Sequence, residues 1–81
     1  MEYLAFYETK AKPGRNFDII YEVFKTEDSF VIESYIGGGV FREKASVGTC
    51  GEKEAEKIAK LLAENGVHPV HIEDIISDMM F

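Results

Sequence analysis

The chain has 81 residues, of which 46% are hydrophobic and 30% are charged. This length supports one domain, because a second hydrophobic core would have too little chain to build it. The composition is ordinary for a folded domain and excludes a wholly disordered chain. We therefore expect a single small domain over residues 1–81.

The net charge excludes two classes of partner. Fifteen acidic residues against nine Lys and Arg residues give a formal net charge of -6. Nucleic-acid binding draws its affinity from Lys and Arg on phosphates, and anionic membrane surfaces likewise attract basic segments. The densest basic cluster, Lys10, Lys12 and Arg15, is interpreted as a solvated hairpin tip. We expect the partner to be neither nucleic acid nor membrane.

Cysteine content and the first residues indicate a cytoplasmic protein. Cys50 is the single cysteine, so no intramolecular disulfide can form, which is typical of a reducing compartment. The start, Met1-Glu2-Tyr3-Leu4, has neither the basic region nor the apolar run of a signal peptide. No apolar run approaches the roughly 18 residues that a membrane-spanning helix needs.

The first half of the chain is typical of β-strands. Aromatic and β-branched residues dominate four segments, at residues 3–9, 17–25, 29–36 and 40–47. Turn-forming residues separate these segments, and the last turn is Gly37-Gly38-Gly39. Short gaps favour antiparallel neighbours, because parallel strands need a long crossover connection. The pattern predicts an antiparallel meander of about four strands.

The hydrophobic pattern selects the pairing of the second and third strands. Placing Lys25 opposite Ser29 would mix apolar and charged side chains on both faces of the sheet. A shift by one residue gathers apolar side chains on one face, namely Phe17, Ile19, Tyr21, Val23, Phe30, Ile32 and Ile36. The connecting loop is then predicted at residues 25–28, which is a common hairpin length.

The second half of the chain is helical. A capping box is expected in which Thr49 and Glu52 satisfy each other's backbone amides. The main helix is predicted over residues 51–65, because four apolar residues recur at helical spacing: Ala55, Ile58, Ala59 and Leu62. Gly66 can adopt the left-handed conformation that ends a helix, and Pro69 blocks continuation.

A short C-terminal helix is predicted from about His71 to the end. Its apolar residues recur with a period of about 3.6: Ile72, Ile75, Ile76, Met79 and Met80. A segment this short is not helical alone, so its apolar side must dock on the rest of the domain. Together with the strands and the main helix, this predicts an α+β fold.

The predicted sheet has apolar residues on its second face as well. The central strands place Ile20, Phe24, Val31 and Tyr35 there, beside charged residues such as Glu22 and Glu33. The first strand is expected to alternate, with Leu4 and Phe6 on one side and Tyr3, Ala5 and Tyr7 on the other. Two-sided apolarity is unusual for an antiparallel sheet with one wet face. Either the C-terminal helix or a second copy of the chain could cover it.

The leading functional hypothesis is a non-catalytic protein-interaction module. Its interface is predicted to be the second sheet face, with Ile20, Phe24, Val31 and Tyr35 as anchors. The expected partner is the chain itself, as a homodimer, or another protein. Aromatic residues and Met are the types that interfaces favour.

A thiol-dependent enzyme or ligand binder is one alternative. Cys50 sits at the predicted start of the main helix, where the helix dipole favours a thiolate. A nucleophile needs a base, and His68 and His71 are separated from Cys50 by the whole main helix and a turn.

A metal site is the second alternative. His68, His71 and Asp74, with Asp78 beyond them, carry side chains that bind Zn²⁺ or similar metals. Their spacing matches no known metal signature, and the same residues form the polar side opposite the isoleucines.

No cofactor is expected. Gly37-Gly38-Gly39 is followed by a strand-like segment rather than by the Gly-Lys-Ser/Thr and helix of a phosphate-binding loop. A turn or bulge between strands is the interpretation of these glycines.

Overall fold

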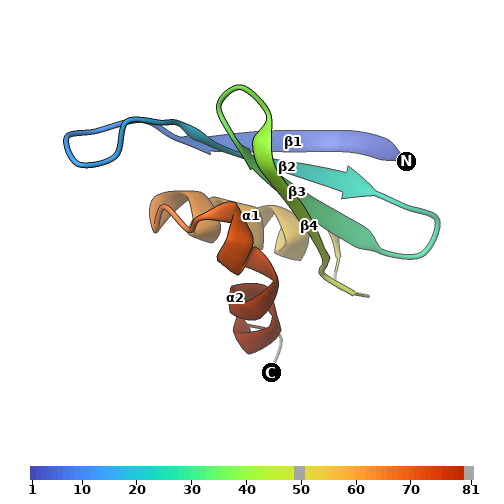
Figure 1. Cartoon of the computed structure of the whole chain (residues 1–81). Coiled ribbons are helices and arrows are strands. Elements are labelled where there is room, and N and C mark those ends of the chain that lie inside the picture. The colour runs from blue at the N-terminus through green and yellow to red at the C-terminus, as the bar shows by residue number, and fades with distance from the viewer. Residues whose placement is uncertain (49–50, 80–81) are drawn as a thin grey trace.

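The structure is a computed structural model that describes residues 1–48 and 51–79 (Figure 1). Its elements in chain order are β1 (Glu2–Thr9), β2 (Ile19–Lys25), β3 (Phe30–Ile36), β4 (Val40–Ser46), α1 (Glu52–Glu64), the short 3₁₀ helix η1 (Pro69–His71) and α2 (Ile72–Met79). The strands form one antiparallel sheet in the order β1-β2-β3-β4. The α+β meander with one main helix and a short C-terminal helix is confirmed.

The connection between β1 and β2 is a long loop that extends beyond the sheet (Figure 1). The Asp18 carboxylate accepts a hydrogen bond from the Ala11 amide at 2.7 Å, and Lys12 pairs with Arg15 at the tip. β2 therefore begins at Ile19, two residues later than expected from the hydrophobic pattern.

The loop between β2 and β3 lies one residue further along than predicted. Lys25 pairs with Phe30, so residues 26–29 form the loop instead of residues 25–28. The Thr26 amide donates to the Ser29 carbonyl at 2.9 Å, and the Ser29 amide donates to Thr26 Oγ1 at 3.1 Å. This local closure decides the register. Because the pairing moves by two residues, each side chain keeps its predicted face.

A β-bulge in β1 overturns the alternation expected for this strand. Tyr3 lies opposite Phe24 and Ala5 lies opposite Val23, so Leu4 is an extra residue. Leu4 packs against the hydrophobic core with Tyr7, whereas Tyr3 and Phe6 lie together on the other face. The expectation that Leu4 shares a face with Phe6 is wrong, because one inserted residue reverses the side of everything before it.

Both helices cover the same face of the sheet, which we call the covered face. Its strand residues Tyr21 and Ile32 are fully buried. α1 contributes four buried side chains, as predicted: Ala55, Ile58, Ala59 and Leu62. The two alanines allow the helix to lie close to the strands, and α2 adds Ile72 and Ile76 to the same core.

The ends of α1 are determined by glycines. Gly51 is the N-cap and provides no side-chain hydrogen bond. The predicted capping box depends on Thr49, which lies outside the described residues. At the other end Gly66 adopts a φ of 59°, and the Val67 amide donates to the Leu62 carbonyl at 3.1 Å. This left-handed ending is the predicted one.

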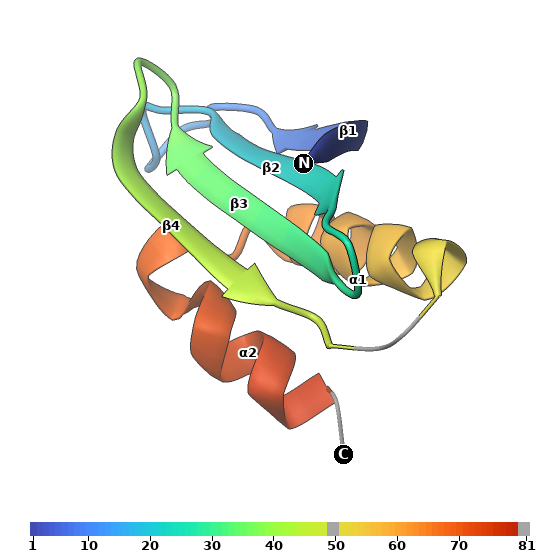
Figure 2. The same cartoon turned by 90° about the vertical axis from the view of Figure 1, so that its right-hand side faces the viewer.

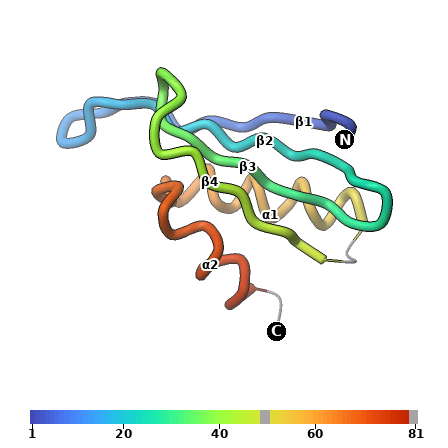
Figure 3. Tube along the Cα trace, turned by 45° about the vertical axis from the view of Figure 1, so that its right-hand side comes forward, coloured from blue at the N-terminus to red at the C-terminus, as the bar shows by residue number. Residues whose placement is uncertain are grey.

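The C-terminal helix is present but does not cover the second face. Pro69 starts η1, a position where its missing amide costs nothing, and α2 follows from Ile72 to Met79. Both η1 and α2 contact β4, and all views place α2 on the α1 side of the sheet (Figures 1–3). Over residues 72–79, the alternative in which this helix folds under the second face is therefore wrong.

A buried tyrosine links the sheet to the turn after α1. The Tyr21 hydroxyl donates to the Val67 carbonyl at 2.6 Å, and Tyr21 is fully buried. Burial raises the pKa of Tyr21, while the neighbouring Thr9 and Arg15 oppose that rise. The neutral phenol therefore remains the hydrogen-bond donor at physiological pH.

Tyr21→Phe removes this hydrogen bond and keeps the ring. We expect the free energy of unfolding to fall by about 1 kcal/mol, because the Val67 carbonyl loses its buried donor. Urea denaturation followed by circular dichroism measures the change. Tyr3→Phe, at a 51% exposed position, is the matched control with little expected effect. Equal stability of the two variants would contradict the role of the Tyr21 hydroxyl.

Candidate functional site

The face of the sheet opposite the helices, which we call the open face, carries three rows of side chains. Residues opposite each other in the strand pairing share a face, so the register defines the rows. The first row consists of Tyr3, Phe24, Val31 and Ser46. The middle row consists of Phe6, Glu22, Glu33 and Lys44. The last row consists of Glu8, Ile20 and Tyr35, with Arg42 over the Tyr35 ring.

The four predicted anchors meet on the open face. Phe24 lies directly opposite Val31, and Ile20 lies directly opposite Tyr35. All four are half-buried. The structure therefore brings together the residues that the hydrophobic pattern indicated, as two apolar pairs on either side of the middle row.

Two aromatic residues of β1 extend this apolar surface. Tyr3 packs edge-to-face on Phe24, with ring centroids 5.6 Å apart. Tyr3 and Phe6 are each 51% exposed. Sequence reasoning did not place them together, because simple alternation puts an odd and an even residue on opposite faces. Only the bulge at Leu4 brings them to the same side.

The middle row contains a charged network. Glu22 and Glu33 lie directly opposite each other, an arrangement of like charges that is unfavourable by itself. Arg42 forms an ion pair with Glu33 and lies over the Tyr35 ring, with its guanidinium carbon 4.1 Å from the ring centroid. Sequence reasoning missed Arg42, since its position depends on a register shift in β4 opposite β3.

Burial and the charged residues of this network shift the pKa of Tyr35. Burial raises the pKa of its phenol, and the charge and hydrogen bonding of Glu22 raise it further. Arg42 acts in the opposite direction, because a cation stabilises the phenolate. Tyr35 is half-buried, so its ring is only partly hydrated on the open face.

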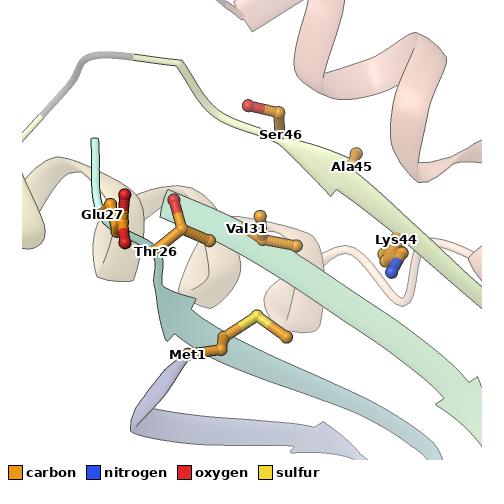
Figure 4. Close-up of a pocket in the computed structure, with 7 residues that line it drawn as sticks. All are labelled: Met1, Thr26, Glu27, Val31, Lys44, Ala45 and Ser46. Carbon is orange, nitrogen blue, oxygen red and sulfur yellow. The ribbon is translucent and has the colours of Figure 1, made fainter. Parts of the chain in front are cut away.

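A hollow lies at the end of the open face next to the β2–β3 loop (Figure 4). Its volume is about 560 Å³. Its walls come from Met1, Thr26, Glu27, Val31, Lys44, Ala45 and Ser46. Figure 4 shows the Met1 side chain reaching from the start of β1 toward Val31. The hollow is therefore lined by three apolar side chains, Met1, Val31 and Ala45, and by polar or charged ones.

The alternative sites have different outcomes in the described residues. Cys50, the candidate nucleophile, lies outside them. His68 and His71 have ring centroids 6.3 Å apart, and His68 Nδ1 accepts a hydrogen bond from the Val70 amide at 3.2 Å. His68 also packs edge-to-face on Phe41, at 5.6 Å. The described part of the chain holds no group of three His, Cys, Asp or Glu side chains placed for a metal. The proposed metal site, with Asp74, stays a prediction.

The three glycines form the turn between β3 and β4, as interpreted from the sequence. Gly38 and Gly39 have φ values of 96° and 85°, and the Gly39 amide donates to the Ile36 carbonyl at 2.8 Å. Left-handed conformations of this kind favour glycine, because a Cβ atom would clash with the backbone.

Within residues 1–48 and 51–79, no helix is both long and apolar enough to cross a membrane. A family model described as a family of unknown function (DUF6514) matches residues 2–81. No curated protein and no solved structure matches the chain.

The tyrosine network is testable by titration. We expect the pKa of Tyr35 to fall in Glu22→Gln, because a negative neighbour is removed, and to rise in Arg42→Ala, because a positive neighbour is removed. NMR titration of the tyrosine ring carbons measures both changes. Lys44→Ala removes a nearby charge that does not act on Tyr35 and serves as the control. If the pKa of Tyr35 is the same in both variants as in the native chain, the proposed interaction of Glu22 and Arg42 with Tyr35 is contradicted.

Proposed function

Because this chain belongs to the DUF6514 family, whose function is unknown, we propose its function from the geometry of the open face. The protein is a non-catalytic interaction module that associates with a second copy of itself. The open face is the contact surface, and Ile20, Phe24, Val31 and Tyr35 are its anchors. Docking of another protein on the same face is the variant that the experiment below separates from self-association.

The observation that supports this proposal is the position of the two helices. α1 and α2 both pack on the covered face, so the apolar rows of the open face have no helix over them in the described residues. An antiparallel sheet with one wet face normally alternates between apolar and polar side chains. The open face departs from this alternation, because it carries the apolar side chains of Tyr3, Phe6, Phe24 and Val31. Exposed apolar patches of this kind are typical of interaction sites.

The charges of the open face support a second copy as the partner. The chain as a whole carries -6, so two copies repel each other at most surfaces. On the open face, however, Glu22 and Glu33 are balanced by Arg42 and Lys44. Glu8, at the edge, has its own ion pair with Lys10 at 3.1 Å. Self-association through this face therefore avoids the repulsion that the remaining acidic surface would cause.

The size of the open face sets the expected strength of association. Four strands about 4.8 Å apart and three rows about 7 Å apart give a footprint of roughly 19 by 20 Å. Two such faces would bury on the order of 1,000 Å² of accessible surface, which is at the low end for specific complexes. We therefore expect a dimer that dissociates on dilution.

The proposed setting is the cytoplasm. The single cysteine cannot form an intramolecular disulfide, and this favours a reducing compartment. The domain instead relies on its one hydrophobic core and, when paired, on the burial of the open face.

The experiment is sedimentation equilibrium over a wide range of protein concentration. We expect the apparent mass of the native chain to rise toward twice that of the monomer. In Phe24→Asp the mass stays monomeric over the same range, because a charge replaces a half-buried anchor at the centre of the first row.

The matched control is Leu61→Asp, which adds the same charge at an exposed apolar position on α1, away from the open face. This variant keeps the native association. A native chain that is monomeric at every concentration contradicts self-association. A dimer that Phe24→Asp leaves intact contradicts the open face as its interface.

A further inference from the structure

We infer that the two copies stack open face on open face about a two-fold axis parallel to the strands. In this arrangement β4 of each copy lies over β1 of the other, and β2 lies over β3. The inference rests on the proposed function and specifies how the second copy is oriented. It follows from the order of the strands and from the charge pattern of the three rows.

Two two-fold axes keep the strands of stacked sheets aligned, which is a preferred geometry for sheets that pack face to face. An axis across the strands places each strand over its own copy. Each middle-row residue then meets itself: Glu22 lies over Glu22, Glu33 over Glu33 and Lys44 over Lys44. Like charges that face each other in a buried interface are strongly unfavourable. This axis therefore creates three like-charge contacts and no contact between opposite charges. The axis along the strands also faces Glu22 with Glu33, but it separates the two copies of Lys44 and brings Glu8 to Arg42, so it is the more favourable of the two.

An axis along the strands keeps each row in place and exchanges its two ends. Phe24 then lies over Val31 of the second copy, and Ile20 lies over Tyr35 of the second copy. Both contacts are apolar and both occur twice. The four anchors thus pair with one another across the interface.

The same axis matches charges at the edges of the sheet. Glu8, on β1, lies over Arg42, on β4 of the second copy. In the middle row Glu22 lies over Glu33 of the second copy, and Lys44 of that copy is one strand, about 4.8 Å, to the side. Arg42 and Lys44 from both copies balance these four carboxylates. The stacked faces therefore bury no excess charge of either sign at their centre.

In this arrangement Tyr3 of the second copy is placed at the hollow at the end of the open face. Tyr3 lies over Ser46 of the second copy, and Ser46 forms part of the wall of the hollow. Tyr3 is 51% exposed, and the hollow has a volume of about 560 Å³. The protruding ring of each copy is therefore placed to enter the hollow of the other.

The test is a charge exchange between Glu8 and Arg42. Glu8→Arg places two cations against each other at both ends of the interface, and Arg42→Glu places two anions there. We expect each variant alone to dissociate about tenfold more readily than the native chain. An equimolar mixture of the two recovers dimers, since the arginine introduced in one chain then faces the glutamate introduced in the other. Sedimentation equilibrium of the variants and of the mixture measures this.

Glu43→Arg is the matched control for the charge change. Glu43 pairs with Ser34, a buried residue of the covered face, so its side chain does not lie on the open face. This variant keeps the native association. Circular dichroism confirms that every variant is folded.

Cross-linking provides a second measurement that tolerates weak variants. In a Cys50→Ser background, a chain with Tyr3→Cys is mixed with a chain with Ser46→Cys and treated with a short bis-maleimide. The axis along the strands predicts a cross-linked heterodimer. The axis across the strands keeps these two positions on different strands at opposite edges and predicts none.

The outcomes separate the two claims. Recovery of dimers in the mixture, with the cross-link, supports the axis along the strands. A second outcome is that Phe24→Asp disrupts the native dimer, but Glu8→Arg and Arg42→Glu leave it unchanged and no cross-link forms. This result overturns the axis along the strands and leaves the open face as the interface. A native chain that never dimerises overturns the proposed function and this inference together.

Discussion

The structure depends on the packing of two helices against one side of a single sheet. Only the covered face receives α1 and α2, and the reason lies in the short turn between them. The Tyr21 hydroxyl holds the Val67 carbonyl, and Pro69 then starts η1 under β4. Because this turn directs the chain along the covered side of β4, Ile72 and Ile76 complete the same core.

This one-sided packing gives the open face its properties. Its apolar rows stay hydrated in a single copy, and local contacts reduce the cost. Tyr3 shields Phe24, and Arg42 covers Tyr35 while it balances Glu33. These contacts shield part of the apolar surface within a single copy. They are also a reason to expect the proposed association to be weak, because partner contacts must replace contacts that already exist within the chain.

The candidate site was predictable where the strand period is regular. Ile20, Phe24, Val31 and Tyr35 lie on the two central strands, where a shift of two residues leaves each side chain on its face. The edge strands were not predictable in the same way. A bulge at Leu4 moved Tyr3 to the open face, and a register shift near Arg42 placed its guanidinium over Tyr35. Bulges depend on tertiary fit and leave little signal in the residues that form them.

The amino-acid sequence by itself determined the meander, the main helix and its ending at Gly66, because hydrophobic period and turn chemistry are local properties. It also determined that the sheet carries apolar side chains on both faces, beside charged residues on the second. Only the tertiary structure decided which of those faces the C-terminal helix covers. That choice depends on the direction in which the chain leaves α1, and this direction is set by the contact of Tyr21 with Val67, which are far apart in the chain.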